Sequence, residues 1–122
     1  MIRVTESNRG VVRFANCAFW GPAHRIGVIE GTGTVGFTDC NFEAWGQDDG
    51  PTEAFLVKGG SFQLRGSLFH RDLPQVTLEE GVERAIITEN LISGEERIDN
   101  RAAGNVVIQN NVSDVAGERD EA

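Results

Sequence analysis

One short motif occurs twice near the start of the chain. Residues 12–19 read VRFANCAF and residues 35–42 read VGFTDCNF, so Val, Phe, Cys and Phe return at matching offsets. A repeat with the spacing from Val12 to Val35 is typical of solenoid proteins, in which each copy forms one turn of a continuous structure. The repeat therefore restricts the possible folds more than any other feature of the sequence.

The same offsets recur in three later segments. They hold Phe62, Leu64, Ser67 and Phe69, then Ala85, Ile87, Asn90 and Ile92, then Val106, Ile108 and Asn111, with Val112 one place early. No long segment shows the apolar pattern of an amphipathic helix, and short β-branched and aromatic runs alternate with Gly, Asn and Asp. The five copies are therefore expected to be built from strands.

We predict an all-β fold, a right-handed single-stranded parallel β-helix of about five coils, over residues 1–113, with a flexible acidic tail over residues 114–122. Residues at equal offsets would then stack about 4.8 Å apart inside the cylinder. The patches before each copy predict the first strand of each coil: Val4, Ile26 with Val28, Phe55 with Val57, Val76 with Leu78, and Ile98. A leucine-rich repeat has a similar period, but its fixed Leu and Asn positions are missing.

One predicted column contains polar side chains and both cysteines. It holds Cys17, Cys40, Ser67, Asn90 and Asn111, directly after the middle strand of each coil. Side chains that hydrogen-bond along the stack can satisfy backbone groups that the bend leaves free. The Cα atoms of Cys17 and Cys40 would lie about 5 Å apart, which permits a disulfide. Free buried thiols are the state we expect.

Composition argues against two classes of partner. The formal charge of −8 repels phosphate backbones, so nucleic acid is not expected as a ligand. No segment has the roughly 18 consecutive apolar residues of a membrane span, and no signal peptide is recognisable. The compartment is left open, with an extracellular location expected if the chain is part of a longer secreted protein.

The repeated V-x-F-x-x-C-x-F and the ending AIITENLISG…IDNRAAGNVVIQNN resemble the C-terminal coils of pectin-lyase-like β-helix proteins. The closest likeness is to bacterial proteins related to glycoside hydrolases or pectate lyases, and it extends from Val4 to Val112. Such relatives act on polysaccharides with clustered aspartates, or with calcium-binding carboxylates and a basic residue. The outward positions of the middle strands here hold Arg13, Gly36 and Gln63, with Ile86 after them, so no acidic catalytic motif carries over.

Polar loops after the third strands would lie side by side along one edge of the solenoid. The candidate ligand-binding residues on this loop strip are Trp20, His24, Arg25, Trp45, His70 and Arg71. Tryptophans offer flat faces to sugar rings, and Asp48, Asp49 or Asp72 are candidates for an acid and base pair or for calcium ligands. The alternative is a set of solvated turns with the tryptophans as an outer apolar layer. The histidines lack the spacing of a metal site, so no resident metal or other cofactor is expected.

Three functional interpretations remain open. The first is a structural or saccharide-binding β-helix module without a complete active site of its own. The second is part of a glycoside hydrolase or polysaccharide lyase that uses the acidic loop residues. The third is an assembly module, as in a fibre or surface protein. Because terminal coils expose unpaired strand edges, a homo-oligomer or additional coils are expected at the N-terminal end.

Overall fold

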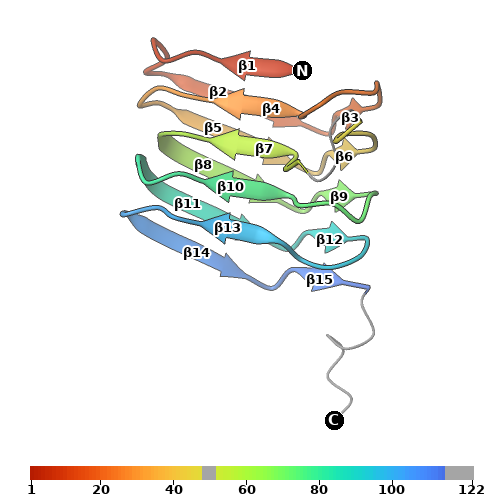
Figure 1. The fold of residues 1–122 in the computed structure, drawn as a ribbon. Helices are drawn as coiled ribbons and strands as arrows, with labels where there is room; N and C mark the ends of the chain where they lie inside the picture. The colour runs from red at the N-terminus through yellow and green to blue at the C-terminus, as the bar shows by residue number, and fades with distance from the viewer. Residues whose placement is uncertain (48–51, 115–122) are drawn as a thin grey trace.

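The secondary structure consists of fifteen short strands, three in each of five coils (Figure 1). The computed structural model describes residues 1–47 and 52–114. The first strands of the coils are β1 (Ile2–Val4), β4 (Gly27–Ile29), β7 (Phe55–Val57), β10 (Val76–Leu78) and β13 (Ile98–Asn100). The second strands are β2 (Val11–Ala15), β5 (Thr34–Thr38), β8 (Gly60–Arg65), β11 (Val82–Thr88) and β14 (Asn105–Gln109). The third strands are β3 (Ala18–Phe19), β6 (Asn41–Phe42), β9 (Leu68–Phe69), β12 (Leu91–Ile92) and β15 (Val112–Ser113).

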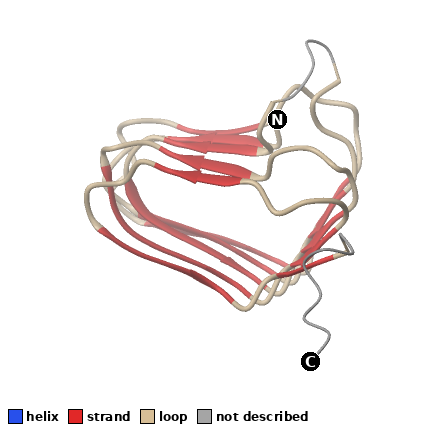
Figure 2. Ribbon diagram, turned by 60° about the horizontal axis from the view of Figure 1, so that its bottom comes forward, coloured by secondary structure: helices blue, strands red, loops and turns tan. Residues whose placement is uncertain are grey.

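Equivalent strands of successive coils pair in parallel and form three five-stranded sheets. We call them the first, middle and third sheets, after the order of their strands in each coil. Figure 2 shows the three sheets surrounding a common interior. The predicted parallel β-helix of about five coils is therefore confirmed. Within the described residues, no helix has the length and apolarity needed to cross a membrane.

The predicted interior columns of the middle sheet are confirmed by the strand register. Val12, Val35, Phe62, Ala85 and Val106 are successive partners, and so are Phe14, Phe37, Leu64, Ile87 and Ile108. In the third sheet the inward column ends at Ser113, which pairs with Ile92. Val112 pairs with Leu91 and is 59% exposed, so the irregular last copy fills its inward place with a small hydroxyl.

The predicted first strand of the second coil is wrong by one residue. Ile29, and not Val28, stacks between Val4 and Val57 in the core column. The other inward position of this strand is Gly27, whose partner is Phe55. A Cβ atom at Gly27 would lie 3.4 Å from the Phe55 ring, so the glycine makes room for that ring.

Phenylalanine rings connect the coils of the N-terminal half. The rings of Phe14 and Phe37 are stacked with centroids 4.8 Å apart, and the centroid of Phe37 lies 4.7 Å from that of Phe55. Phe42 and Phe69 continue the contacts in the third sheet, 4.9 Å apart. All seven phenylalanines lie between residues 14 and 69. The first three coils therefore have an aromatic core, whereas the last two have an aliphatic one.

The bend between the middle and third sheets is the same in all five coils. Each bend places one residue in the left-handed region, with φ from 55° to 64°: Asn16, Asp39, Gly66, Glu89 and Asn110. The next residue belongs to the polar column. Ser67 Oγ accepts a hydrogen bond from the Cys40 N–H at 3.1 Å, and Asn90 Oδ1 accepts one from the Ser67 N–H at 2.9 Å. The column therefore satisfies backbone groups at the bend, as predicted.

Both cysteines at the start of this column are free thiols. The Cys40 sulfur lies within hydrogen-bonding distance of the carbonyl oxygens of Thr38 and Phe14, at 3.4 and 3.5 Å, and its one S–H can donate to either. Burial raises the pKa of the Cys40 thiol above its ordinary value. This thiol is therefore a neutral core group and not an activated nucleophile.

The raised pKa predicts a loss of stability in alkali. Below the ordinary thiol pKa of 9.0, Cys40 is neutral in the folded and unfolded chain, and its contribution to stability is fully present. As the pH rises through the folded-state pKa, that contribution is lost, because only the unfolded chain ionises readily. Denaturant unfolding of the native chain and of Cys40→Ala, at pH values from below 9.0 upward, measures how much stability each protein loses in alkali. If both proteins lose the same stability in alkali, the loss does not come from a raised pKa of Cys40.

Candidate binding face

The structure buries one tryptophan of the predicted loop strip. Trp45 is 0% exposed, and its ring packs edge-on against Phe69 with centroids 5.7 Å apart. The indole Nε1 donates to the Pro74 carbonyl oxygen at 3.1 Å. The prediction that Trp45 offers a flat face to a ligand is therefore wrong, because the loop turns this side chain inward to extend the core.

Two basic residues of the strip are paired with glutamates of the adjacent coil. Arg25 Nε donates to a carboxylate oxygen of Glu53 at 2.5 Å. His70 Nε2 lies 3.3 Å from a carboxylate oxygen of Glu43. These pairs bridge neighbouring loops, so both side chains have a structural role in this arrangement.

Of the three acidic candidates, the structure describes Asp72 alone. Asp72 accepts a hydrogen bond from Arg97 Nη2 at 2.9 Å, and a second from the Glu95 N–H at 3.2 Å. Asp48 and Asp49 lie outside the described residues. Within residues 1–47 and 52–114, no group of three or more His, Cys, Asp or Glu side chains is placed to hold a metal ion.

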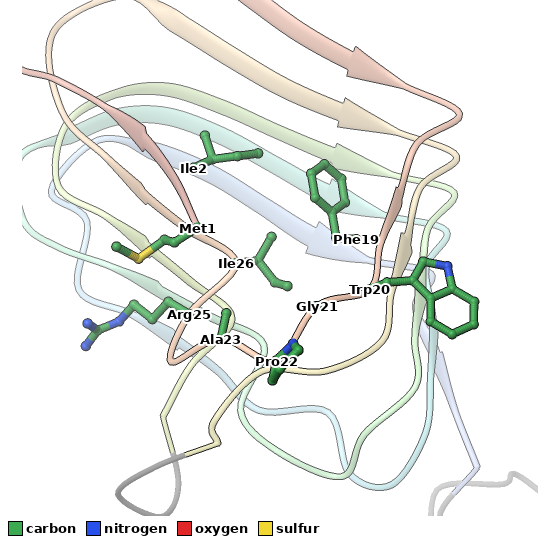
Figure 3. Close-up of a pocket in the computed structure, with 9 residues that line it drawn as sticks. All are labelled: Met1, Ile2, Phe19, Trp20, Gly21, Pro22, Ala23, Arg25 and Ile26. Carbon is green, nitrogen blue, oxygen red and sulfur yellow. The ribbon is translucent and has the colours of Figure 1, made fainter.

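The remaining strip residues do not converge with Trp45. Trp20 is 71% exposed. Figure 3 shows its indole pointing away from a hollow whose inner side chains include Phe19 and Ile26. His24 and Arg71 are half-buried, and the His24 carbonyl oxygen accepts from the Gly46 N–H at 2.9 Å. The described part of the strip therefore combines a buried tryptophan with half-buried and exposed side chains.

A different surface has a uniform chemical character. We call it the middle-sheet face, the outer surface of β2, β5, β8, β11 and β14. Alternation along each strand points three side chains outward, opposite the core columns. These are Val11, Arg13, Ala15, Thr34, Gly36, Thr38, Ser61, Gln63, Arg65, Arg84, Ile86, Thr88, Asn105, Val107 and Gln109.

The charge of this face is opposite to that of the whole chain. It carries three arginines and no carboxylate, although the chain has 19 acidic residues and a net charge of −8. Glu83 lies beside the face, in the irregular start of β11 where the register shifts between Val82 and Arg84. The other polar side chains of the face are neutral hydroxyls and amides. The face is therefore a local basic surface rich in hydrogen-bonding groups.

Hydrogen bonds between coils fix two of the arginines. Arg13 Nη1 donates to Gln63 Oε1 at 3.0 Å, reaching across the intervening strand at Gly36. A Cβ atom at Gly36 would lie 3.2 Å from the same oxygen, so the missing side chain leaves space for this contact. Arg84 Nε donates to Ser61 Oγ at 3.1 Å. Because each bond uses one donor of a guanidinium that has five, donors remain for a ligand.

A hollow lies at the centre of the face. Thr34, Ser61, Gln63, Arg84 and Ile86 line it. The sequence pattern predicts outward positions for Gln63 and Ile86, and neither residue is one of the carboxylates that the resemblance implies for a catalytic site. In the sequence, the middle-sheet face can be recognised by Arg, Thr, Ser, Gln and Asn at alternate positions of the middle strands.

Comparison with known proteins identifies no family for this chain. No protein-family model, curated protein or solved structure matches it. The coiled β-helix architecture is shown by the structure itself. The middle-sheet face is a property of this chain's own residues.

Proposed function

We propose that this chain is a β-helix module that binds an acidic polysaccharide along the middle-sheet face. The observation that carries the proposal is that the regularly paired outward positions of the described middle strands hold three arginines and no carboxylate, with Glu83 set apart at the register shift of β11. Guanidinium groups bind carboxylates through paired hydrogen bonds. Sugar carboxylates are therefore a suitable partner for this surface.

The neutral groups of the face favour a polysaccharide over other polyanions. Thr34, Ser61, Gln63, Asn105 and Gln109 alternate with the arginines and match a ligand that has many hydroxyls and few charges. Nucleic acid has one charge for about every 1.7 Å of duplex, and the negative charge of the whole chain opposes it. The resemblance to pectin-lyase-like proteins supports the same ligand class.

Binding without catalysis is the role that this face supports. Hydrolysis of a glycosidic bond by the usual mechanism requires two carboxyl groups on either side of the bond. The described middle strands supply one exposed carboxyl group, Glu83 at the register shift of β11, and not the pair that this mechanism requires. The arginines and amides would hold a chain of sugars in place, and their attachment to a rigid sheet keeps them in a fixed array.

Removing the arginines is expected to weaken binding of an acidic oligosaccharide. Calorimetric titration with oligogalacturonate should show a loss of affinity of about threefold for Arg84→Gln and about tenfold for Arg13→Gln combined with Arg84→Gln, because each exposed charged contact contributes about 0.7 kcal/mol. A neutral glucan of equal length should bind weakly or not at all.

Arg101→Gln is the matched control for this titration. Arg101 has the same charge and is exposed, but it lies after β13 and pairs with Asp99 at 2.8 Å, away from the middle-sheet face. This variant should bind like the native chain. Equal losses for Arg101→Gln and Arg84→Gln, or equal binding of the neutral glucan, would contradict the proposed face.

A further inference from the structure

The apolar side chains of the N-terminal coil are more exposed than their equivalents in the next coil, among the residues that the structure describes. β1, β2 and β3 are edge strands of the three sheets. Val12, Phe14 and Phe19 are only partly buried, whereas the side chains that continue their columns in the next coil have almost no exposed surface. Unpaired edges of this kind are templates for pairing with another chain.

The C-terminal coil of the described chain has a matching end. β13, β14 and β15 are the opposite edge strands, and they have three, five and two residues, as do β1, β2 and β3. If the columns continue into a second copy, Ile98 meets Ile2, Val106 meets Val12, and Ile108 meets Phe14. Apolar side chains cover apolar side chains at these three contacts, whereas Asn100 would meet Val4 and Ser113 would meet Phe19.

The two ends carry opposite charge. Residues 1–25 contain four arginines and one glutamate, whereas residues 95–114 contain four acidic residues and two arginines. Contact between unlike ends brings opposite charges together, and contact between like ends brings the same charges together. Electrostatic complementarity of this kind selects one orientation of two partners.

One pair of residues fixes the expected contact. Arg3, Val28, Leu56, Thr77 and Asp99 form the outward column at the centre of the first sheet. In a second copy that continues the sheet, Arg3 therefore follows Asp99 at the spacing of neighbouring strands, about 4.8 Å. Both side chains are exposed.

We propose that the C-terminal coil of one copy stacks on the N-terminal coil of the next. All three sheets then run on from copy to copy with parallel pairing. Because the two surfaces differ, the contact is heterologous and leaves one free end at each extremity, so it generates an open series of copies. This inference rests on the two ends and does not depend on the middle-sheet face.

Charge reversal tests the proposal in solution. We expect the weight-average mass of the full chain in sedimentation equilibrium to rise with concentration from 13.3 kDa past that of two chains. Arg3→Asp and Asp99→Arg should each weaken association about tenfold or more, because each places like charges in contact. An equimolar mixture of the two variants should regain association, since their unlike ends match again.

Arg65→Asp is the control, because it makes the same charge change in the third coil, which is covered by coils on both sides. Circular dichroism of each variant verifies that the fold is retained. A native chain that stays at 13.3 kDa overturns the proposal. A mass that levels off at two chains and is unchanged by Asp99→Arg also overturns it. The same is true if the mixture of the two variants does not regain association, or if Arg65→Asp weakens association as much as they do.

Discussion

Replacing Phe37 by Ala should lower the free energy of unfolding by about 3 to 5 kcal/mol. Phe37 is 0% exposed, and its ring lies between those of Phe14 and Phe55, with centroid distances of 4.8 and 4.7 Å. Removal of the ring leaves a cavity between three coils, and the paired strands around it cannot close the gap. Denaturant unfolding followed by circular dichroism measures the change.

Phe14→Ala is the matched control for this experiment. Phe14 occupies the same column and stacks on Phe37, but it lies in the first coil and is partly exposed. We expect a smaller loss there, because less apolar surface is removed from the core. If Phe37→Ala lowers the free energy of unfolding by less than about 1 kcal/mol, Phe37 does not occupy the core column between Phe14 and Leu64.

Replacing Asn90 by Leu should cost about 2 to 5 kcal/mol of stability, since it leaves two or more buried polar groups unpaired. Asn90 is 1% exposed. Its Oδ1 accepts from the Ser67 N–H at 2.9 Å, and its Nδ2 donates to the Leu64 carbonyl oxygen at 3.2 Å. Leucine has a similar volume but replaces neither bond. Thermal and denaturant unfolding of the variant measure the loss.

Asn90→Ser separates the hydrogen bond from the packing. In the preceding coil, Ser67 Oγ already accepts from the Cys40 N–H at 3.1 Å, so a serine at this column position can serve as the acceptor. We expect Asn90→Ser to be less destabilising than Asn90→Leu. A neutral effect of Asn90→Leu would mean that the backbone groups at this bend find other partners.

The sequence predicted the stacked columns correctly because the short bend fixes their register. Between the middle and third strands the chain always takes two residues, such as Asn16 and Cys17 or Glu89 and Asn90. The loops before the first strands vary in length, so sequence spacing did not determine whether Val28 or Ile29 faces inward. Only the pairing with Val57 decides that register.

The candidate site was harder to predict for two physical reasons. Trp45 lies in a polar loop, and its burial depends on a core opening beside Phe69 that only the folded chain provides. The middle-sheet face becomes a surface only when strands from five coils are laid side by side. Arg13, Gln63 and Arg84 are far apart in the sequence, and their contacts to neighbouring coils join them.

The uneven distribution of phenylalanine makes the coils unequal as folding units. In a solenoid each coil contacts only its neighbours, so local stability follows the local core. Seven rings lie in the first three coils, whereas the last coil contributes Ile98, Val106 and Ile108 beside Asn111 and Ser113. We therefore expect hydrogen exchange to show the C-terminal coil opening before the aromatic coils.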